Sequence, residues 1–131
     1  MTNAARRWSD KQATPLELPM HFAVADLLRM AIKPGWIWFH CPSGEFRFKA
    51  TAGKLKRMGV KPGVADILLI SPVGAKLHAL ELKRKHRSPT SDQTDFLNAV
   101  QACGGHSAWA DSLEDAVTIL LNWGAIRKVE L

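Results

Sequence analysis

Apolar residues recur three and four positions apart near both ends of the chain, which predicts amphipathic helices there. Over residues 19–32 the spacing is formed by Val24, Leu27, Leu28 and Ala31. A last helix is expected to begin at 111 or 112 and to stop before Gly124. A short basic helix is expected over 51–58, and another helix from 89 or 90 to 103. The pattern therefore predicts four helices.

Between these helices, short runs of β-branched, aromatic and other apolar residues predict strands over 36–40, 64–70, 76–83 and 106–110. Alternation at 46–48 predicts one more short extended piece. Residues 71–75, Ser-Pro-Val-Gly-Ala, form a turn-rich link, so the second and third of the four strands are expected to form a hairpin. This order of elements predicts an α/β fold with a central mixed sheet flanked by helices.

Length and composition set further limits on the fold and its surroundings. A chain of 131 residues fits one domain, expected over 16–131, after a flexible basic arm at 1–15. The sequence contains no apolar run long enough for a membrane span and no secretory signal, and we expect a cytoplasmic protein with Cys41 and Cys103 reduced. The net charge of +6 favours a polyanionic partner such as nucleic acid.

The candidate chemistry lies in the hairpin. In a strand, Glu81 and Lys83 point to one face, and Leu82 points to the other. Asp66 interrupts the apolar strand that precedes them, which is costly unless its carboxylate finds a partner. If Ile70 pairs with Leu77, Asp66 lies opposite Glu81, with Cβ atoms about 4.5–5.5 Å apart. A shift of one residue in this register would move Asp66 to the opposite face.

Two carboxylates at that separation repel each other unless a proton or a cation lies between them. Mg2+ or Mn2+ would satisfy both with hard oxygen ligands, and a neighbouring lysine would orient water and stabilise negative charge. These are the requirements of metal-dependent phosphodiester hydrolysis. By itself, an E-x-K sequence is also consistent with a surface ion pair on an edge strand.

The wider pattern resembles a known family. It consists of Gly-Val-Lys-Pro-Gly-Val-Ala-Asp at 59–66, Glu-Leu-Lys at 81–83, Gln93, and Gly-Gly at 104–105. It is similar to the VRR-NUC family of the PD-(D/E)XK nuclease superfamily. The segment with Pro42, Gly44, Glu45 and Arg47 resembles the small phage and prophage members. The likeness extends from about residue 17 to 123. One departure is Ala65, where the family usually has proline.

The resemblance implies a restriction-endonuclease-like fold, with Asp66 and Glu81 as metal ligands and Lys83 as the catalytic lysine. It also implies a glutamate on the first helix, for which Glu17 is the best candidate, although Glu17 could equally be a solvated acid at the helix start. Whether Glu17 or His21 completes the site is left open. Gln93 precedes an apolar helix face and is expected beside the lysine, the alternative being an ordinary helix cap.

Basic residues flank the proposed centre in sequence and could contact phosphates on either side of the scissile bond. They are Lys54, Lys56, Arg57, Lys61, Arg84, Lys85 and Arg87. By analogy with stand-alone relatives that resemble Holliday-junction resolvases, branched DNA and a homodimer are expected. Two alternatives remain: a catalytically inactive DNA-binding module of the same fold, and a phage interaction protein without nuclease activity.

Overall fold

The computed structural model describes residues 18–42 and 49–130. The expected arm at 1–15, Glu17, and the extended piece predicted at 46–48 lie outside the described residues. In chain order, the elements are α2 (Leu18–Ala31), β1 (Ile37–His40), α3 (Lys49–Met58), β2 (Ile67–Ile70), β3 (Leu77–Leu82), α4 (Ser91–Ala102), β4 (His106–Ala110) and α5 (Leu113–Asn122).

The four strands form one mixed sheet in the order β1-β2-β3-β4. β2 pairs antiparallel with β1 on one side and with β3 on the other. β4 pairs parallel with β3, and the chain reaches it through α4. Ile70 pairs with Leu77, and Ile67 pairs with Leu80, so the predicted hairpin is confirmed and the register assumed for Asp66 and Glu81 is the one observed. A parallel neighbour requires a crossover, and the helix predicted between these two strands provides it.

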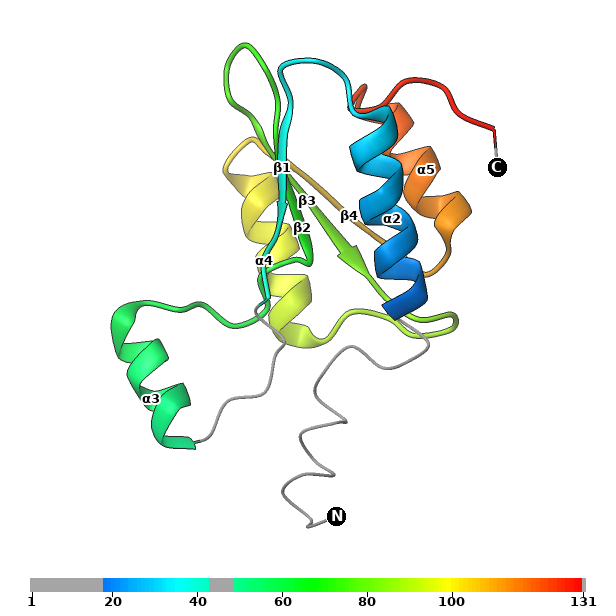
Figure 1. The fold of residues 1–131 in the computed structure, drawn as a ribbon. Helices are drawn as coiled ribbons and strands as arrows, with labels where there is room; N and C mark the ends of the chain where they lie inside the picture. Colours follow the sequence, from blue (N-terminus) through cyan, green and yellow to red (C-terminus); the bar gives the residue numbers. More distant parts are fainter. Residues whose placement is uncertain (1–17, 43–48, 131) are drawn as a thin grey trace.

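Helices cover both faces of the sheet (Figure 1). α2 and α5 lie on one face, where the larger core forms around fully buried residues such as Leu28, Leu69, Leu80 and Leu120. α4 lies on the other face and closes a smaller core of Ala65, Ala79, Leu97 and Val100. Because strand residues alternate between faces, Glu81 faces the α4 side and Leu80 and Leu82 face α2 and α5.

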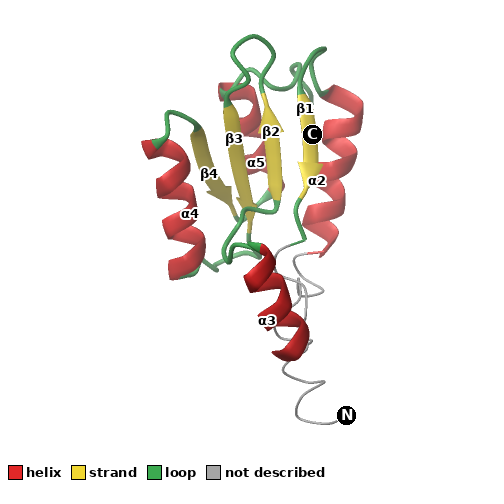
Figure 2. Ribbon diagram, turned by 90° about the vertical axis from the view of Figure 1, so that its left-hand side faces the viewer, coloured by secondary structure: helices red, strands yellow, loops and turns green. Residues whose placement is uncertain are grey.

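α3 lies apart from these layers, beyond the end of the sheet where β2 begins and β3 ends (Figure 2). The helix stops at Met58, and Gly59 follows with a positive φ of 102°. No helix within 18–42 and 49–130 combines the length and the apolar character needed to cross a bilayer.

Candidate active site

Asp66 and Glu81 lie at the open end of the hairpin, one position beyond the last strand pair, Ile67 with Leu80. The backbone N–H of Leu82 donates to Asp66 Oδ2 at 2.8 Å. The Asp66 side chain therefore continues the hydrogen bonding between β2 and β3 after the backbone ladder has stopped. This bond fixes one carboxylate oxygen and holds the acid beside β3.

Glu81 is only 3% exposed, on the face of β3 that α4 covers. Its Oε1 accepts a hydrogen bond from Gln93 Nε2 at 2.9 Å, and its Oε2 has no hydrogen-bond partner among the described residues. Burial, followed by the nearby Asp66 carboxylate, raises the pKa of Glu81 to about 9, while Lys83 opposes the shift. Without a cation, Glu81 is therefore protonated at neutral pH.

The N-terminus of α4 determines how Gln93 meets Glu81. The side chain of the N-cap residue Thr90 accepts from the backbone N–H of Gln93, and Gln93 Oε1 accepts from the backbone N–H of Thr90 at 2.9 Å. This reciprocal capping box holds the Gln93 amide oxygen at the helix end, which leaves the amide nitrogen to donate to Glu81. The helix cap, one of the two alternatives for Gln93, is therefore present, and the same side chain also donates to Glu81. Its expected place beside Lys83 stays a prediction.

Gly63 allows the loop before β2 to approach the same helix end. Its φ is +78°, and a Cβ built there would lie 2.4 Å from the backbone oxygen of Asp92 and 2.9 Å from the nitrogen of Gln93. A side chain at this position is excluded by both the backbone conformation and the space. Gly63 therefore lets the loop that leads to Asp66 pack against the N-terminus of α4, whose Gln93 donates to Glu81.

Lys83 follows Glu81 by two residues and immediately follows β3. Its backbone N–H donates to Ala110 O at 2.8 Å, so hydrogen bonding to β4 continues past the strand and fixes the position of the lysine backbone. The side chain is half-buried. The positive charge of Lys83 lowers the pKa of Glu81 electrostatically, so the lysine favours the ionised form of this buried acid.

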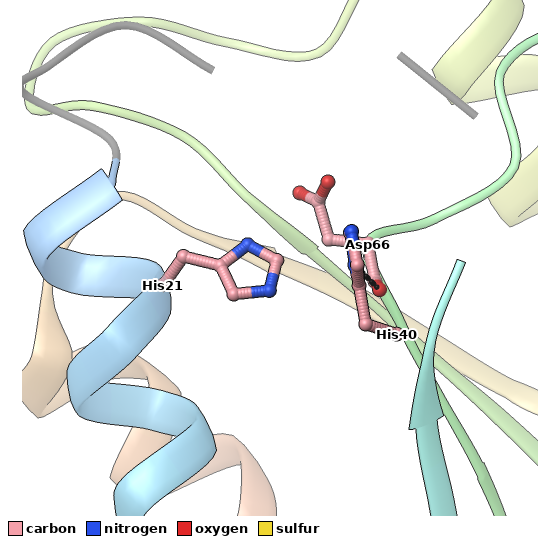
Figure 3. Close-up of side chains that lie close together, drawn as sticks. All are labelled: His21, His40 and Asp66. Atoms are coloured by element: carbon pink, nitrogen blue, oxygen red, sulfur yellow. Dashed lines mark hydrogen bonds between the residues drawn. The ribbon is translucent and has the colours of Figure 1, made fainter. Parts of the chain in front are cut away.

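Two histidines complete this end of the sheet (Figure 3). His21 on α2 points toward His40 at the end of β1, and their ring centroids are 4.4 Å apart at an interplanar angle of 89°. His40 Nδ1 lies 2.7 Å from the backbone oxygen of Asp66. One nitrogen from each ring and one carboxylate oxygen of Asp66 all lie within 4.8 Å of one another.

Sequence reasoning considered His21 but did not identify His40. The available signal was the final position of His40 in an aromatic strand, and its use required knowing that β1 pairs with β2. That pairing places His40 opposite Ile67, next to Asp66. Burial and the neighbouring His40 lower the pKa of His21, although Asp66 opposes the shift. The lowered pKa favours the neutral imidazole of His21, the form that can bind a metal.

The basic residues proposed for DNA contacts lie in two segments near this end. Lys54, Lys56 and Arg57 are exposed on α3, and Lys61 is exposed in the loop that follows it. In the second segment, which follows β3, Lys85 and Arg87 are exposed and Arg84 is half-buried. α3 and the loop after β3 both lie at the end of the sheet that holds the carboxylates (Figure 2).

A solved structure described as a VRR_NUC domain protein has the same fold. The TM-score is 0.65 at 20% sequence identity, and the match covers 82% of this chain and 87% of that one. No family model matches the sequence, and no curated protein matches it. The comparison confirms the predicted resemblance at the level of the fold, a mixed sheet flanked by helices of the restriction-endonuclease-like kind.

Proposed function

We propose that this protein is a metal-dependent nuclease that hydrolyses phosphodiester bonds in DNA. The main support is the pair of carboxyl groups at the end of the hairpin, with Glu81 buried beside Asp66 and with Lys83, the residue after β3, near enough to act electrostatically on Glu81. A nuclease-type fold in the structural neighbour agrees with this assignment but does not by itself identify the activity.

The residues fit a divalent cation. Glu81 Oε2 is buried and lacks a partner among the described residues, and leaving such an oxygen unpaired costs about 1–3 kcal/mol. Asp66 and Glu81 would hold Mg2+ or Mn2+, as both donors are carboxylate oxygens, which these ions prefer. When bound, the ion would activate water and stabilise negative charge on the phosphate. Glu17, proposed as a further ligand, lies outside the described residues.

The surrounding residues have distinct proposed roles. Gln93 binds Glu81 through Oε1, and Oε2 is left without a hydrogen-bond partner among the described residues. The N–H of Leu82 orients Asp66. Lys83, as a cation that acts electrostatically on Glu81, would orient the attacking water and stabilise charge that develops on the phosphate.

DNA would be held by the two exposed basic segments. Replacing Lys54, Lys56 and Arg57 with serine should lower the affinity for DNA and reduce the steepness of log K against log salt by about 2–3. The reason is that each phosphate contact releases counterions when DNA binds, and the variant makes fewer such contacts. Serine at Lys33 and Lys128, which are exposed outside both basic segments, provides a control that removes two positive charges, and it is compared with the test variant per charge removed. Equal losses in both variants would contradict the proposed DNA surface.

Branched DNA such as a four-way junction is the favoured substrate, and a homodimer is the favoured assembly, because a two-fold dimer would present two active sites to a symmetric junction. Both assignments, together with a cytoplasmic location, rest on analogy with the family that the sequence resembles. The proposed activity does not depend on them.

The test is cleavage of labelled four-way junction, flap and linear duplex DNA in Mg2+, Mn2+ or EDTA. Wild type should cut in the presence of metal, and Glu81→Ala and Lys83→Ala should not. Glu114→Ala and Lys76→Ala remove exposed residues of the same types outside the site and should cut like wild type. DNA binding without cutting would favour the inactive DNA-binding module, and the absence of both would favour an interaction protein.

A further inference from the structure

We propose that His21, His40 and Asp66 form a second cation site, which binds a transition-metal ion such as Zn2+ or Co2+ through two imidazole nitrogens and one carboxylate oxygen. This site shares Asp66 with the proposed active centre but adds nitrogen donors that Mg2+ does not favour. Binding at this site requires no DNA and no cleavage, so the inference extends beyond the proposed function.

The geometry brings the three donors together from three elements. The candidate ligand atoms of α2, β1 and the start of β2 lie within 4.8 Å of one another (Figure 3). Donor atoms that bind one Zn2+ tetrahedrally at about 2.1 Å lie about 3.4 Å apart. Closing the site around an ion would therefore draw the ligand atoms together by about 1 Å or slightly more.

His40 is already oriented as a metal ligand would be. Its Nδ1 is 2.7 Å from the Asp66 carbonyl oxygen, and a carbonyl oxygen can only accept, so Nδ1 is the protonated nitrogen. In the neutral ring, Nε2 then holds the free lone pair. A hydrogen bond from one ring nitrogen to a carbonyl, with the other nitrogen free, is the arrangement found in most metal-bound histidines.

The site is also accessible and of suitable composition. His40 is exposed, and His21 and Asp66 are half-buried, so an ion can enter from solvent. Two imidazoles and one carboxylate would leave at least one position for water, as in open zinc sites. Within the described parts of the chain, this is the one set of three such side chains close enough to hold an ion.

The experiment is titration of the metal-free, full-length chain with Co2+, followed by visible absorption and by calorimetry. Imidazole-bound Co2+ should give visible bands that Zn2+ abolishes by competition and that millimolar Mg2+ leaves in place. His40→Asn removes the Nε2 ligand but retains a side-chain N–H for the Asp66 carbonyl, and should weaken Co2+ binding at least about 10-fold. His21→Ala should weaken it similarly, while the thermal midpoint of the metal-free variant verifies folding.

Two controls separate this site from the proposed active centre. His86→Asn removes an exposed histidine at a positive φ of 67°, which asparagine tolerates, and should leave Co2+ binding unchanged. Glu81→Gln should abolish DNA cleavage but preserve the Co2+ bands. Failure of the nuclease proposal is therefore seen in cleavage, and failure of this inference is seen in the spectrum.

The inference is overturned if wild type gives no imidazole-type spectrum, or if His40→Asn and His21→Ala bind Co2+ as tightly as wild type. Loss of the bands in Glu81→Gln would also overturn it, because the ion would then belong to the carboxylate pair rather than to the histidines.

Discussion

Two pairs of histidines lie at opposite ends of the same sheet, and their surroundings differ. At the end where β1 finishes, the rings of His21 and His40 are perpendicular, with centroids 4.4 Å apart, beside Asp66. At the other end, His78 and His106 are stacked with centroids 4.6 Å apart and an interplanar angle of 20°. The two pairs have similar spacing but not similar neighbours.

His78, the buried member of the second pair, is flanked by two tryptophan rings. Trp36 and Trp123 contact His78 edge-on at centroid distances of 4.9 and 5.1 Å, and His78 is 4% exposed. Its Nδ1 lies 3.1 Å from the carbonyl oxygen of Lys76. Burial lowers the pKa of His78, which favours the neutral form of its ring. A histidine pair thus becomes a candidate ligand set only where the fold adds a carboxylate.

The largest expected effect is the loss of cleavage on removing the acid shared by both proposed sites. Asp66→Asn retains an oxygen that can accept from Leu82 N–H but weakens cation binding, and single-turnover DNA cleavage should fall by about 10³-fold or more. His106→Asn, at the aromatic end, should change the rate less than about threefold. If the two variants had comparable rates, the functional contrast between the ends of the sheet would be wrong.

The two ends of the sheet should also differ in how much the fold is destabilised when a glycine is replaced with alanine. Gly63→Ala places a Cβ against the backbone of α4, and we expect it to lower the free energy of unfolding by about 3 kcal/mol or more. Gly74 in the β2–β3 turn also has a positive φ, but its Cβ would meet nothing within 4 Å. Gly74→Ala should therefore cost only about 1 kcal/mol. Urea unfolding at pH 7 measures both, and equal costs would contradict the close approach at Gly63.

A pH series tests the buried acid. Because the folded-state pKa of Glu81 is raised to about 9, the folded metal-free protein retains a proton that the unfolded chain has already lost. Its stability should therefore fall as pH rises from the ordinary glutamate pKa toward 9, by about 1 kcal/mol per pH unit.

Between pH 7 and 9 an ordinary histidine has already lost its proton, so the slope in this interval isolates Glu81 from histidines such as His78. The lowered pKa of His78 acts in the opposite direction, because stability is lost as pH falls below the ordinary histidine value. Unfolding in EDTA should show the decline in wild type but not in Glu81→Gln. A parallel slope in both would refute the burial of a protonated Glu81.

The smallest effect concerns the choice of side chain at the α4 cap. Gln93→Glu preserves the capping box, which accepts either residue, but removes the donor to Glu81 and adds a third carboxyl group. We expect stability to change by about 1 kcal/mol or less, and metal-dependent cleavage to fall about 10-fold. Thr90→Ala is the complementary variant, which loses the cap at a cost of about 1 kcal/mol. Similar cleavage by Gln93→Glu and wild type would show that Gln93 only caps the helix.

Much of the fold followed from local patterns in the sequence. The predicted bounds of the helices and strands lie within a few residues of the observed ones, and the turn-rich link predicts the hairpin. The register that places Asp66 opposite Glu81 was only a condition of the sequence argument, and the structure meets it. β2 pairs only from Ile67, three residues after the predicted start, because the preceding loop is drawn toward α4 at Gly63. That approach depends on a contact distant in sequence.

Long-range pairing also limited what could be predicted of the site. Nothing local indicates that β1 joins β2, so His40 could not be placed beside Asp66. Likewise, the depth at which Glu81 is buried depends on α4 covering its strand face, 10 or more residues later in the chain. Gln93 was predicted near the site, but its simultaneous role in the capping box required the structure.

The hydrogen bond from Leu82 to Asp66 has a consequence for folding cooperativity. Asp66 is tied to β3 by this bond and to β1 by its own carbonyl, which contacts His40 and the N–H of Cys41. A cation held by Asp66 and the histidines would link these strands to α2, so none of these elements could separate without releasing it. An ion at 100 times its dissociation constant would add about 2.7 kcal/mol to the stability of the whole domain. The end of the sheet that leaves a buried Glu81 oxygen without a partner among the described residues would then be the place where a bound ion holds these elements together.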